Sequence, residues 1–225
     1  MTTARDGTPA EAANALETLC RGYWPAIYAY VRREGHGIEE ARDLTQAFFV
    51  DFIKREHLSR LVHTRGRFRS FLLTFLKHFL SDERDKARAQ KRGGDLHFLS
   101  VDEFTEEERH AFEPSERATP ESVFERRWAE ALLKRALDRL RGEYAREGRS
   151  TLFEALKDLQ PGKHGEQSYA TLGPQLGLSE NGLKTAVHRM RQRHRQILRE
   201  EIAHTVSRPE EIDEEIRHLL AVLAG

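Results

Sequence analysis

The residues of this sequence best suited to a chemical task are the cations of one predicted helix, from Lys184 to Arg199. This stretch holds six Lys or Arg and no Asp or Glu, within a 225-residue chain whose formal net charge is zero. Apolar residues repeat at helical spacing on one face: Leu183, Val187, Met190 and Ile197. The cations fall on the other faces, so one side can pack while the other meets a polyanion. Nucleic-acid binding depends on where positive charge is concentrated, and net neutrality does not exclude it.

The residues before this helix predict the turn that would position it. A short first helix has an apolar stripe of Tyr169, Leu172 and Leu176. Gly177 supplies the positive φ that a tight turn needs, and Ser179 can cap the second helix. The stretch from Ser168 to Arg199 therefore predicts a DNA-reading helix-turn-helix. Pro174 departs from this pattern, because proline inside a helix removes a backbone donor, and we expect a first helix that is kinked or short.

Composition and periodicity predict an all-α protein. With 33% charged and 38% hydrophobic residues among 225, the chain is long enough for one large domain or two small ones. No window shows the sustained alternation of a strand. The lone Cys20 excludes a disulfide framework and a cysteine-rich zinc site. We find no signal peptide and no apolar run that would span a bilayer, so we expect no membrane segment and a cytoplasmic protein.

Two further segments have strongly unbalanced charge. Residues 65–92 carry nine Lys or Arg against three Asp or Glu, and residues 95–125 carry ten acidic residues against two basic ones. The first segment predicts a long helix with an apolar first half and a charged second half, and the second predicts a charge-extended linker. Aromatic rings beside basic side chains are what proteins use to bind single-stranded DNA, although a core helix with a charged tail is the commoner arrangement.

The helix predicted from Ile38 to about Glu56 has an apolar arc wider than a small core requires. Its apolar residues are Leu44, Phe48, Phe49, Phe52 and Ile53. Phenylalanines at this spacing usually belong to a core, whereas the polar Asp43 and Gln46 mark the alternative, a surface that binds a partner. Before this helix, Pro25 is expected to divide the N-terminal region into two helices.

We therefore expect two small helical domains joined by an acidic linker, the second containing the helix-turn-helix. The expected boundaries are a disordered N-terminus at 1–8, a first domain at 9–92, the linker at 93–120, a second domain at 121–206 and a C-terminal amphipathic helix at 207–225. The first helix of the second domain is predicted to bury Phe124, Trp128, Leu132, Leu137, Leu140 and Tyr144. The C-terminal helix is predicted to bury Ile212, Ile216, Leu219, Leu220 and Leu223.

Three of these segments, in this order, resemble bacterial RNA polymerase sigma factors of the small, two-domain, extracytoplasmic-function type. Asp43–Ile53, DLTQAFFVDFI, is similar to the family's core-polymerase-binding helix. Arg65–Arg92 resembles the helix that melts and reads the minus-ten promoter element, and Leu176–Leu198 resembles the reader of the minus-thirty-five element. A helix-turn-helix alone is weakly specific, whereas the three together at this spacing are typical of the family. The resemblance covers about Leu16 to Glu201.

The resemblance implies a division of labour among these segments. The first domain would bind the clamp helices of the largest subunit of core RNA polymerase through Asp43, Leu44, Gln46 and Phe49. The basic helix would hold opened, single-stranded promoter DNA with a flipped base, through Arg67, Arg69, Lys77, Arg84 and Arg88. The second domain would read double-stranded DNA in the major groove, with base contacts from Asn181, Lys184, Thr185, His188 and Arg189 and backbone contacts from Arg191 and Arg193.

The same resemblance implies a specificity subunit for transcription initiation without catalysis, cofactor or metal of its own. It leaves room for an anti-sigma factor or another regulator as a further partner. The helix after Val206 lies beyond the usual end of such a protein, and we expect it either to pack on the second domain or to regulate access to polymerase. The connector is also long and acidic for the family.

Two other classes of function compete with this interpretation. A stand-alone helix-turn-helix regulator with an N-terminal sensor or dimerisation domain would need a pocket or a dimer seam at Asp43–Ile53, where polar residues stand beside surplus phenylalanines. A metal-dependent nuclease or phosphohydrolase has only the eleven histidines in its favour. They form no HExxH or similar ligand set, and no paired nucleophile and base or phosphate-binding glycine loop occurs.

Overall fold

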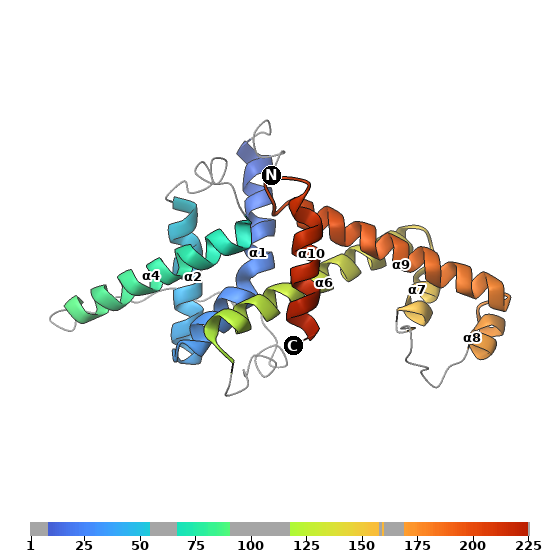
Figure 1. The fold of residues 1–225 in the computed structure, drawn as a ribbon, viewed down its shortest axis with the longest axis horizontal. Coiled ribbons are helices and arrows are strands. Elements are labelled where there is room, and N and C mark those ends of the chain that lie inside the picture. Colours follow the sequence, from blue (N-terminus) through green and yellow to red (C-terminus); the bar gives the residue numbers. More distant parts are fainter. Residues whose placement is uncertain (1–8, 55–66, 91–117, 158, 160–168, 225) are drawn as a thin grey trace. The chain divides into compact units, whose positions relative to one another are not determined.

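The structure, a computed structural model, describes residues 9–54, 67–90, 118–157, 159 and 169–224. The described part contains eight helices and no strand, which confirms the all-α prediction for these residues (Figure 1). The helices are α1 (Pro9–Arg33), α2 (Ile38–Lys54), α4 (Phe68–Gln90), α6 (Pro120–Arg146), α7 (Ser150–Leu156), α8 (Tyr169–Gln175), α9 (Glu180–Ala203) and α10 (Glu211–Ala224). None of them combines the length and apolar character of a membrane-spanning helix. The predicted N-terminus 1–8 and most of the predicted linker, 93–117, lie outside the described residues.

Contacts divide the chain into two compact units. Residues 1–131 and 203–225 form the first unit, and residues 132–202 form the second. The division falls inside α6 and near the end of α9, whereas we expected boundaries at 120 and 206. In this division α10 falls in the first unit, whereas we expected it either to pack on the second domain or to regulate access to polymerase.

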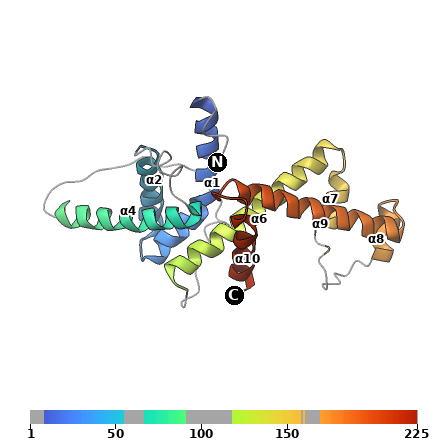
Figure 2. The same cartoon turned by 45° about the horizontal axis from the view of Figure 1, so that its top comes forward.

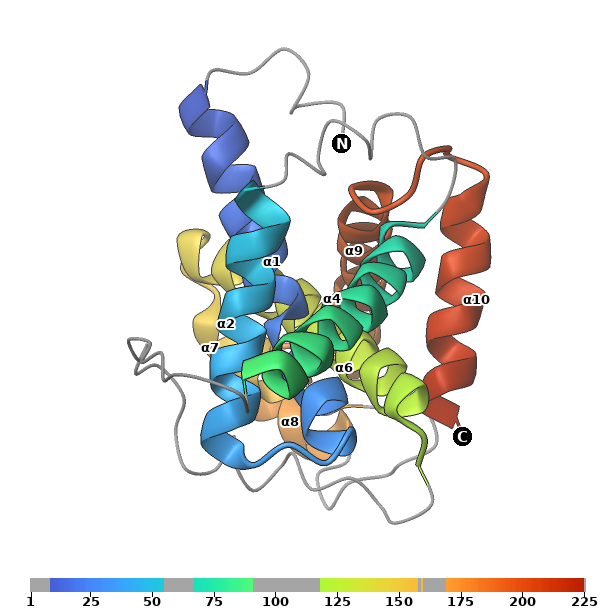
Figure 3. The same cartoon turned by 90° about the vertical axis from the view of Figure 1, so that its left-hand side faces the viewer.

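Aromatic side chains build the core of the first unit. The helices α1 and α2 lie side by side, and α4 packs against them (Figure 3). The ring of Phe48 on α2 lies 5.5 Å from Phe75 and 5.6 Å from Phe79 on α4, measured between centroids. Tyr23 of α1 and Phe68 of α4 meet edge to face at 5.2 Å. Each such pair contributes about 0.5–1.5 kcal/mol beyond its buried area, which fixes α4 on the two preceding helices.

The helix α1 continues through Pro25, so the expected division of this region was wrong. A proline inside a helix costs about 3 kcal/mol. The residues around it, Tyr23, Ala26 and Ile27, are no more than 1% exposed. We infer that burial of these side chains along one continuous helix outweighs the lost hydrogen bond, a tertiary effect that local sequence does not reveal.

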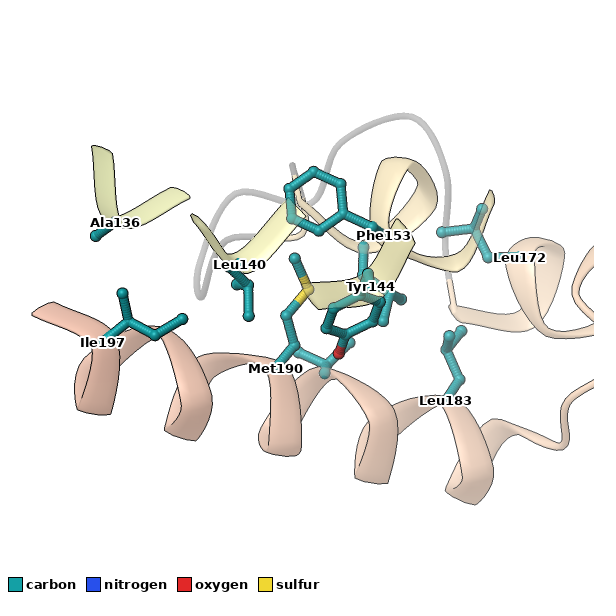
Figure 4. Packing of buried hydrophobic residues seen from close by; sticks show 10 residues of the cluster. Ala136, Leu140, Tyr144, Phe153, Leu172, Leu183, Met190 and Ile197 are labelled. Carbon is teal, nitrogen blue, oxygen red and sulfur yellow. The ribbon is translucent and has the colours of Figure 1, made fainter. Parts of the chain in front are cut away.

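The second unit is organised around an apolar cluster (Figure 4). Its buried members are Ala136, Leu140, Tyr144, Phe153, Leu156, Leu172, Leu183, Val187, Met190 and Ile197. They come from the second half of α6 and from α7, α8 and α9, and the stripe predicted for α9 is confirmed. Leu137, which was predicted to face inward, is 37% exposed. One shared core thus holds α8 and α9 in place.

Candidate functional site

The turn between α8 and α9 has the geometry that the sequence predicted. Gly177 adopts φ +65°, and the Ser179 hydroxyl accepts a hydrogen bond from the Gly182 amide at 3.1 Å. A second glycine, Gly173, is required by close approach, because a Cβ there would lie 2.8 Å from the Leu178 carbonyl oxygen. Pro174 is the penultimate residue of the seven-residue α8, so this helix is short. The turn therefore fixes the direction in which α9 begins.

The outward face of α9 contains every residue expected to contact bases. All of them are exposed: Asn181, Lys184, Thr185, His188 and Arg189. The Lys184 ammonium lies 2.6 Å from the Glu180 carboxylate, an exposed i,i+4 pair. Such pairs contribute about 0.3–0.5 kcal/mol, so another anion can replace Glu180 at little cost. The opposite side of α9 is buried in the apolar cluster, and these polar residues are left facing outward.

Arg193, which was expected to contact the DNA backbone, is held inside the second unit instead. It donates to both carboxylate oxygens of Glu143, at 2.7 and 2.6 Å, and to Glu200 at 3.2 Å. The hydrogen bonds to Glu143 raise the pKa of this guanidinium, although partial burial opposes the shift. Arg193 bonds within the unit rather than facing solvent because its side chain points toward α6, which carries Glu143.

Arg191, the other expected backbone contact, also bonds within the unit. Its guanidinium donates to the Leu159 carbonyl oxygen at 2.6 Å. Arg195 and Arg199, which were not among the expected DNA contacts, are exposed. Helical spacing could have found them, since they follow His188 by seven and eleven residues and so share its face. They extend the cationic surface along the same side of α9 as the base-reading candidates.

On α2, one exposed stripe combines polar and apolar residues. Asp43 is exposed and Gln46 is half-buried, and Val50 and Ile53 follow at helical spacing with 43% and 46% exposure. Neither Val50 nor Ile53 was among the residues expected to bind a partner. The signal that could have found them is their spacing of four and seven residues from Gln46. Two exposed β-branched residues beside polar ones form a compact surface suited to another protein.

Of the other two residues expected on this surface, Phe49 faces inward. Phe49 is 7% exposed, and its ring stacks on Trp24 of α1 with centroids 5.5 Å apart. This burial corrects the expectation that Phe49 contacts a partner. Leu44 is half-buried. In the wide apolar arc of α2 the phenylalanines thus pack in the core, whereas Ile53 is exposed, as is Val50 next to the arc.

The basic residues of α4 fall into an exposed and a buried group. Lys77 and Arg84 are exposed and form ion pairs with Glu121 at 2.6 Å and with Glu34 at 3.3 Å. The Arg88 side chain lies outside the described residues. Arg69 differs, because it is only 4% exposed and therefore does not reach DNA in this structure. Among the five cations expected to hold opened DNA, burial thus corrects the expectation for Arg69.

Carboxylates surround Arg69. Glu215 of α10 accepts hydrogen bonds from its Nε at 2.9 Å and its Nη2 at 3.3 Å, and Glu125 of α6 pairs with its Nη1. Burial by itself would lower the pKa of Arg69, but Glu215 and Glu125 outweigh burial, and the pKa is raised. The guanidinium also lies over the ring of Trp128, 4.8 Å from its centroid. The cation is thus permanently charged and fully committed to neighbours within the first unit.

Comparison with protein-family models, with curated proteins and with solved structures found no match for this chain.

Proposed function

We propose that this protein is a sigma factor of the extracytoplasmic-function type, which binds core RNA polymerase and directs promoter recognition, DNA opening and transcription initiation in the cytoplasm. The observation that carries the proposal is the outward face of α9. It presents Asn181, Lys184, Thr185, His188 and Arg189 together, on a helix whose other side is buried and whose start is fixed by a capped turn. This arrangement suits a helix that enters the major groove, where side chains near its N-terminus meet base edges.

In this proposal α8, the Gly177 turn and α9 act as a helix-turn-helix that reads the minus-thirty-five element. Arg195, which is exposed, replaces Arg191 and Arg193 as the candidate for a phosphate contact, because that pair bonds within the unit. Phosphate contacts fix the register of a recognition helix and base contacts supply its specificity. The second unit thereby has both kinds of group on one surface.

The stripe on α2 supports the proposed binding of core polymerase. Asp43 and Gln46 offer hydrogen-bonding groups, and Val50 and Ile53 offer exposed apolar area next to them. Interfaces of this kind combine an apolar centre with a polar rim. We propose that these four residues contact the clamp helices of the largest polymerase subunit.

The exposed cations of α4 support the proposed role in holding opened DNA. Lys77 and Arg84 pair with Glu121 and Glu34 across exposed surfaces, where ion pairs typically contribute 0–1 kcal/mol. A phosphate backbone can therefore take the place of either carboxylate. The rings of Phe71 and Phe75 pack against Phe52 of α2, so the exposed cations alone support this part of the proposal.

Capture of core RNA polymerase by the tagged full-length chain tests this proposal. Val50→Glu should abolish capture, because it places a charge in the centre of the stripe. Ile38→Glu is the matched control, since Ile38 is 47% exposed on the same helix but lies off the stripe. Failure of the wild-type chain to bind core polymerase would contradict the sigma-factor proposal.

The exposed Val50 and Ile53 favour one second candidate, a stand-alone regulator that dimerises through α2. Light scattering of the purified chain distinguishes the two candidates. A monomer that binds polymerase supports the sigma factor, and a dimer disrupted by Val50→Glu that does not bind polymerase supports the regulator.

A further inference from the structure

The C-terminal helix α10 covers two cations that we expected to bind single-stranded DNA. Glu214 lies 2.9 Å from Arg67 Nη2, and Glu215 lies 3.0 Å from Arg67 Nε. Glu215 also accepts both hydrogen bonds from Arg69 described above, and it is 1% exposed. Figures 1 and 2 show α10 beside α6, whose Glu125 and Trp128 contact His218 of α10. The two carboxylates of α10 thus occupy the positions that phosphates would need.

The same helix also covers an aromatic ring. Trp128 is 2% exposed, lies 4.8 Å beneath the Arg69 guanidinium and contacts His218 of α10 at 6.2 Å between ring centroids. Two arginines beside a tryptophan have the composition of a site for a single-stranded nucleic acid, in which bases stack on the ring and cations bind the backbone. Removal of α10 would take away the Glu214, Glu215 and His218 side chains that lie against these three residues.

The contact between α10 and the rest of the first unit depends strongly on charge. The buried face of α10 consists of Glu211, Glu215 and Leu219. Glu211 accepts hydrogen bonds from the amides of Ser207 and Arg208 at the start of the helix. Further along α10, Leu219 is buried, Glu214 and Glu215 form ion pairs with Arg67 and Arg69, and His218 Nε2 lies 3.0 Å from a Glu125 carboxylate oxygen. An interface whose centre is a carboxylate on two arginines can be opened by a polyanion that offers equivalent oxygens.

We propose that α10 is an autoinhibitory segment, with Glu214 and Glu215 occupying the arginines that opened promoter DNA binds. This inference rests on the proposed role of α4 in binding single-stranded DNA. DNA and α10 then compete, and the apparent affinity for DNA falls in proportion to the fraction of molecules in which α10 is displaced. A variant that weakens the ion pairs increases this fraction and so strengthens DNA binding.

Binding of a fluorescein-labelled single-stranded DNA 20-mer to the full-length chain tests the competition. Glu214→Gln removes an exposed ion pair and should raise the affinity about twofold to fivefold. Glu215→Gln, which removes a buried charge, should raise it by about tenfold or more. Glu210→Gln is the control, because it removes the same charge from an exposed position on the same tail. Equal gains in DNA affinity in all three variants would show that only long-range repulsion between the carboxylates and DNA had been reduced, and would overturn the proposal.

Hydrogen exchange of the wild-type chain supplies a readout that needs no substitution. Amides of residues 211–224 should lose protection when the DNA 20-mer binds. DNA binding with α10 fully protected would overturn the autoinhibition and leave the sigma-factor proposal standing. If neither the wild-type chain nor the Glu215→Gln variant binds the 20-mer, the autoinhibition is also overturned, while capture of core polymerase decides the proposed function separately.

Discussion

Glu215 binds Arg69 through two hydrogen bonds, 2.9 Å from Nε and 3.3 Å from Nη2, although 146 positions separate the two residues in the chain. Both side chains are almost completely buried. Charges removed from water must be paired, and the loss of one partner leaves the other charge only partly compensated. The pair therefore determines where the C-terminal helix lies in the first unit.

Glu215→Ala should lower the free energy of unfolding of the first unit by about 3–5 kcal/mol, because it leaves the buried Arg69 charge with Glu125 alone. Replacement of both partners, Arg69→Met with Glu215→Leu, should recover most of this loss. Urea unfolding followed by tryptophan fluorescence measures it, since both tryptophans of the chain belong to the first unit. A loss below about 1 kcal/mol for Glu215→Ala would show that the pair is not structural.

The two sides of α2 should respond differently to substitution. Phe49→Ala should destabilise the first unit by about 3–5 kcal/mol, because it leaves a cavity beside Trp24. Asp43→Ala and Val50→Glu should leave stability nearly unchanged and reduce capture of core polymerase. Thermal melting and a capture assay on the same preparations check this division. Weak capture by a folded Phe49→Leu variant, with normal capture by Val50→Glu, would reverse the assignment of the two faces.

Substitution of three cations on α9 should have three different effects, on sequence discrimination, on the salt dependence of DNA binding and on stability. Lys184→Ala should lose discrimination between promoter sequences, by about 1–3 kcal/mol for a base contact. Arg195→Ala should weaken binding to all sequences alike and flatten the log–log salt dependence by about 0.9. Arg193→Ala should instead destabilise the second unit, by about 1.5–3 kcal/mol for lost charged hydrogen bonds.

Fluorescence titrations of promoter fragments at several salt concentrations distinguish the three effects. A change of salt slope in Arg193→Ala, with none in Arg195→Ala, would show that phosphate is bound by the inward-facing residue.

His194 should make the stability of the second unit dependent on pH. Burial lowers the pKa of this imidazole from 6.5, and its Nε2 is buried without a hydrogen-bond partner. The unfolded chain then binds a proton at a higher pH than the folded chain does. The stability that the neutral His194 imidazole gives to the folded state is fully present above pH 6.5. It is lost as the pH falls from 6.5 through the folded-state pKa.

Urea unfolding at about pH 7.5 and about pH 5.5, with hydrogen exchange of α9 as the probe, measures this dependence. The variant His194→Leu should lose less stability than the wild-type chain over this interval. An equal loss in the two proteins would assign the pH dependence to other groups.

Features that depend only on residues close together in the chain could be predicted from the sequence. The Gly177 turn, the Ser179 cap and the buried side of α9 follow from backbone sterics, hydrogen bonding and helical spacing. Leu183, Val187, Met190 and Ile197 are buried as their spacing predicted.

Features that depend on distant residues could not be predicted in this way. A glutamate in an amphipathic helix is expected to face solvent. Glu215 is buried because it pairs with Arg69, which lies 146 residues earlier in the chain. Leu220, which was predicted to be buried, is 58% exposed. Arg193 turned inward for the same kind of reason, since Glu143 lies on α6. Spacing within a helix shows that its two faces differ. Which charged side chains form ion pairs inside the protein depends on partners from other helices.

Run-off transcription with purified core RNA polymerase, on templates selected for binding to this chain, tests the central claim most directly. The account predicts initiation at a defined start site only when the chain is present, and its loss in Val50→Glu but not in Ile38→Glu. Absence of both core binding and promoter-dependent initiation by the folded wild-type chain would contradict it.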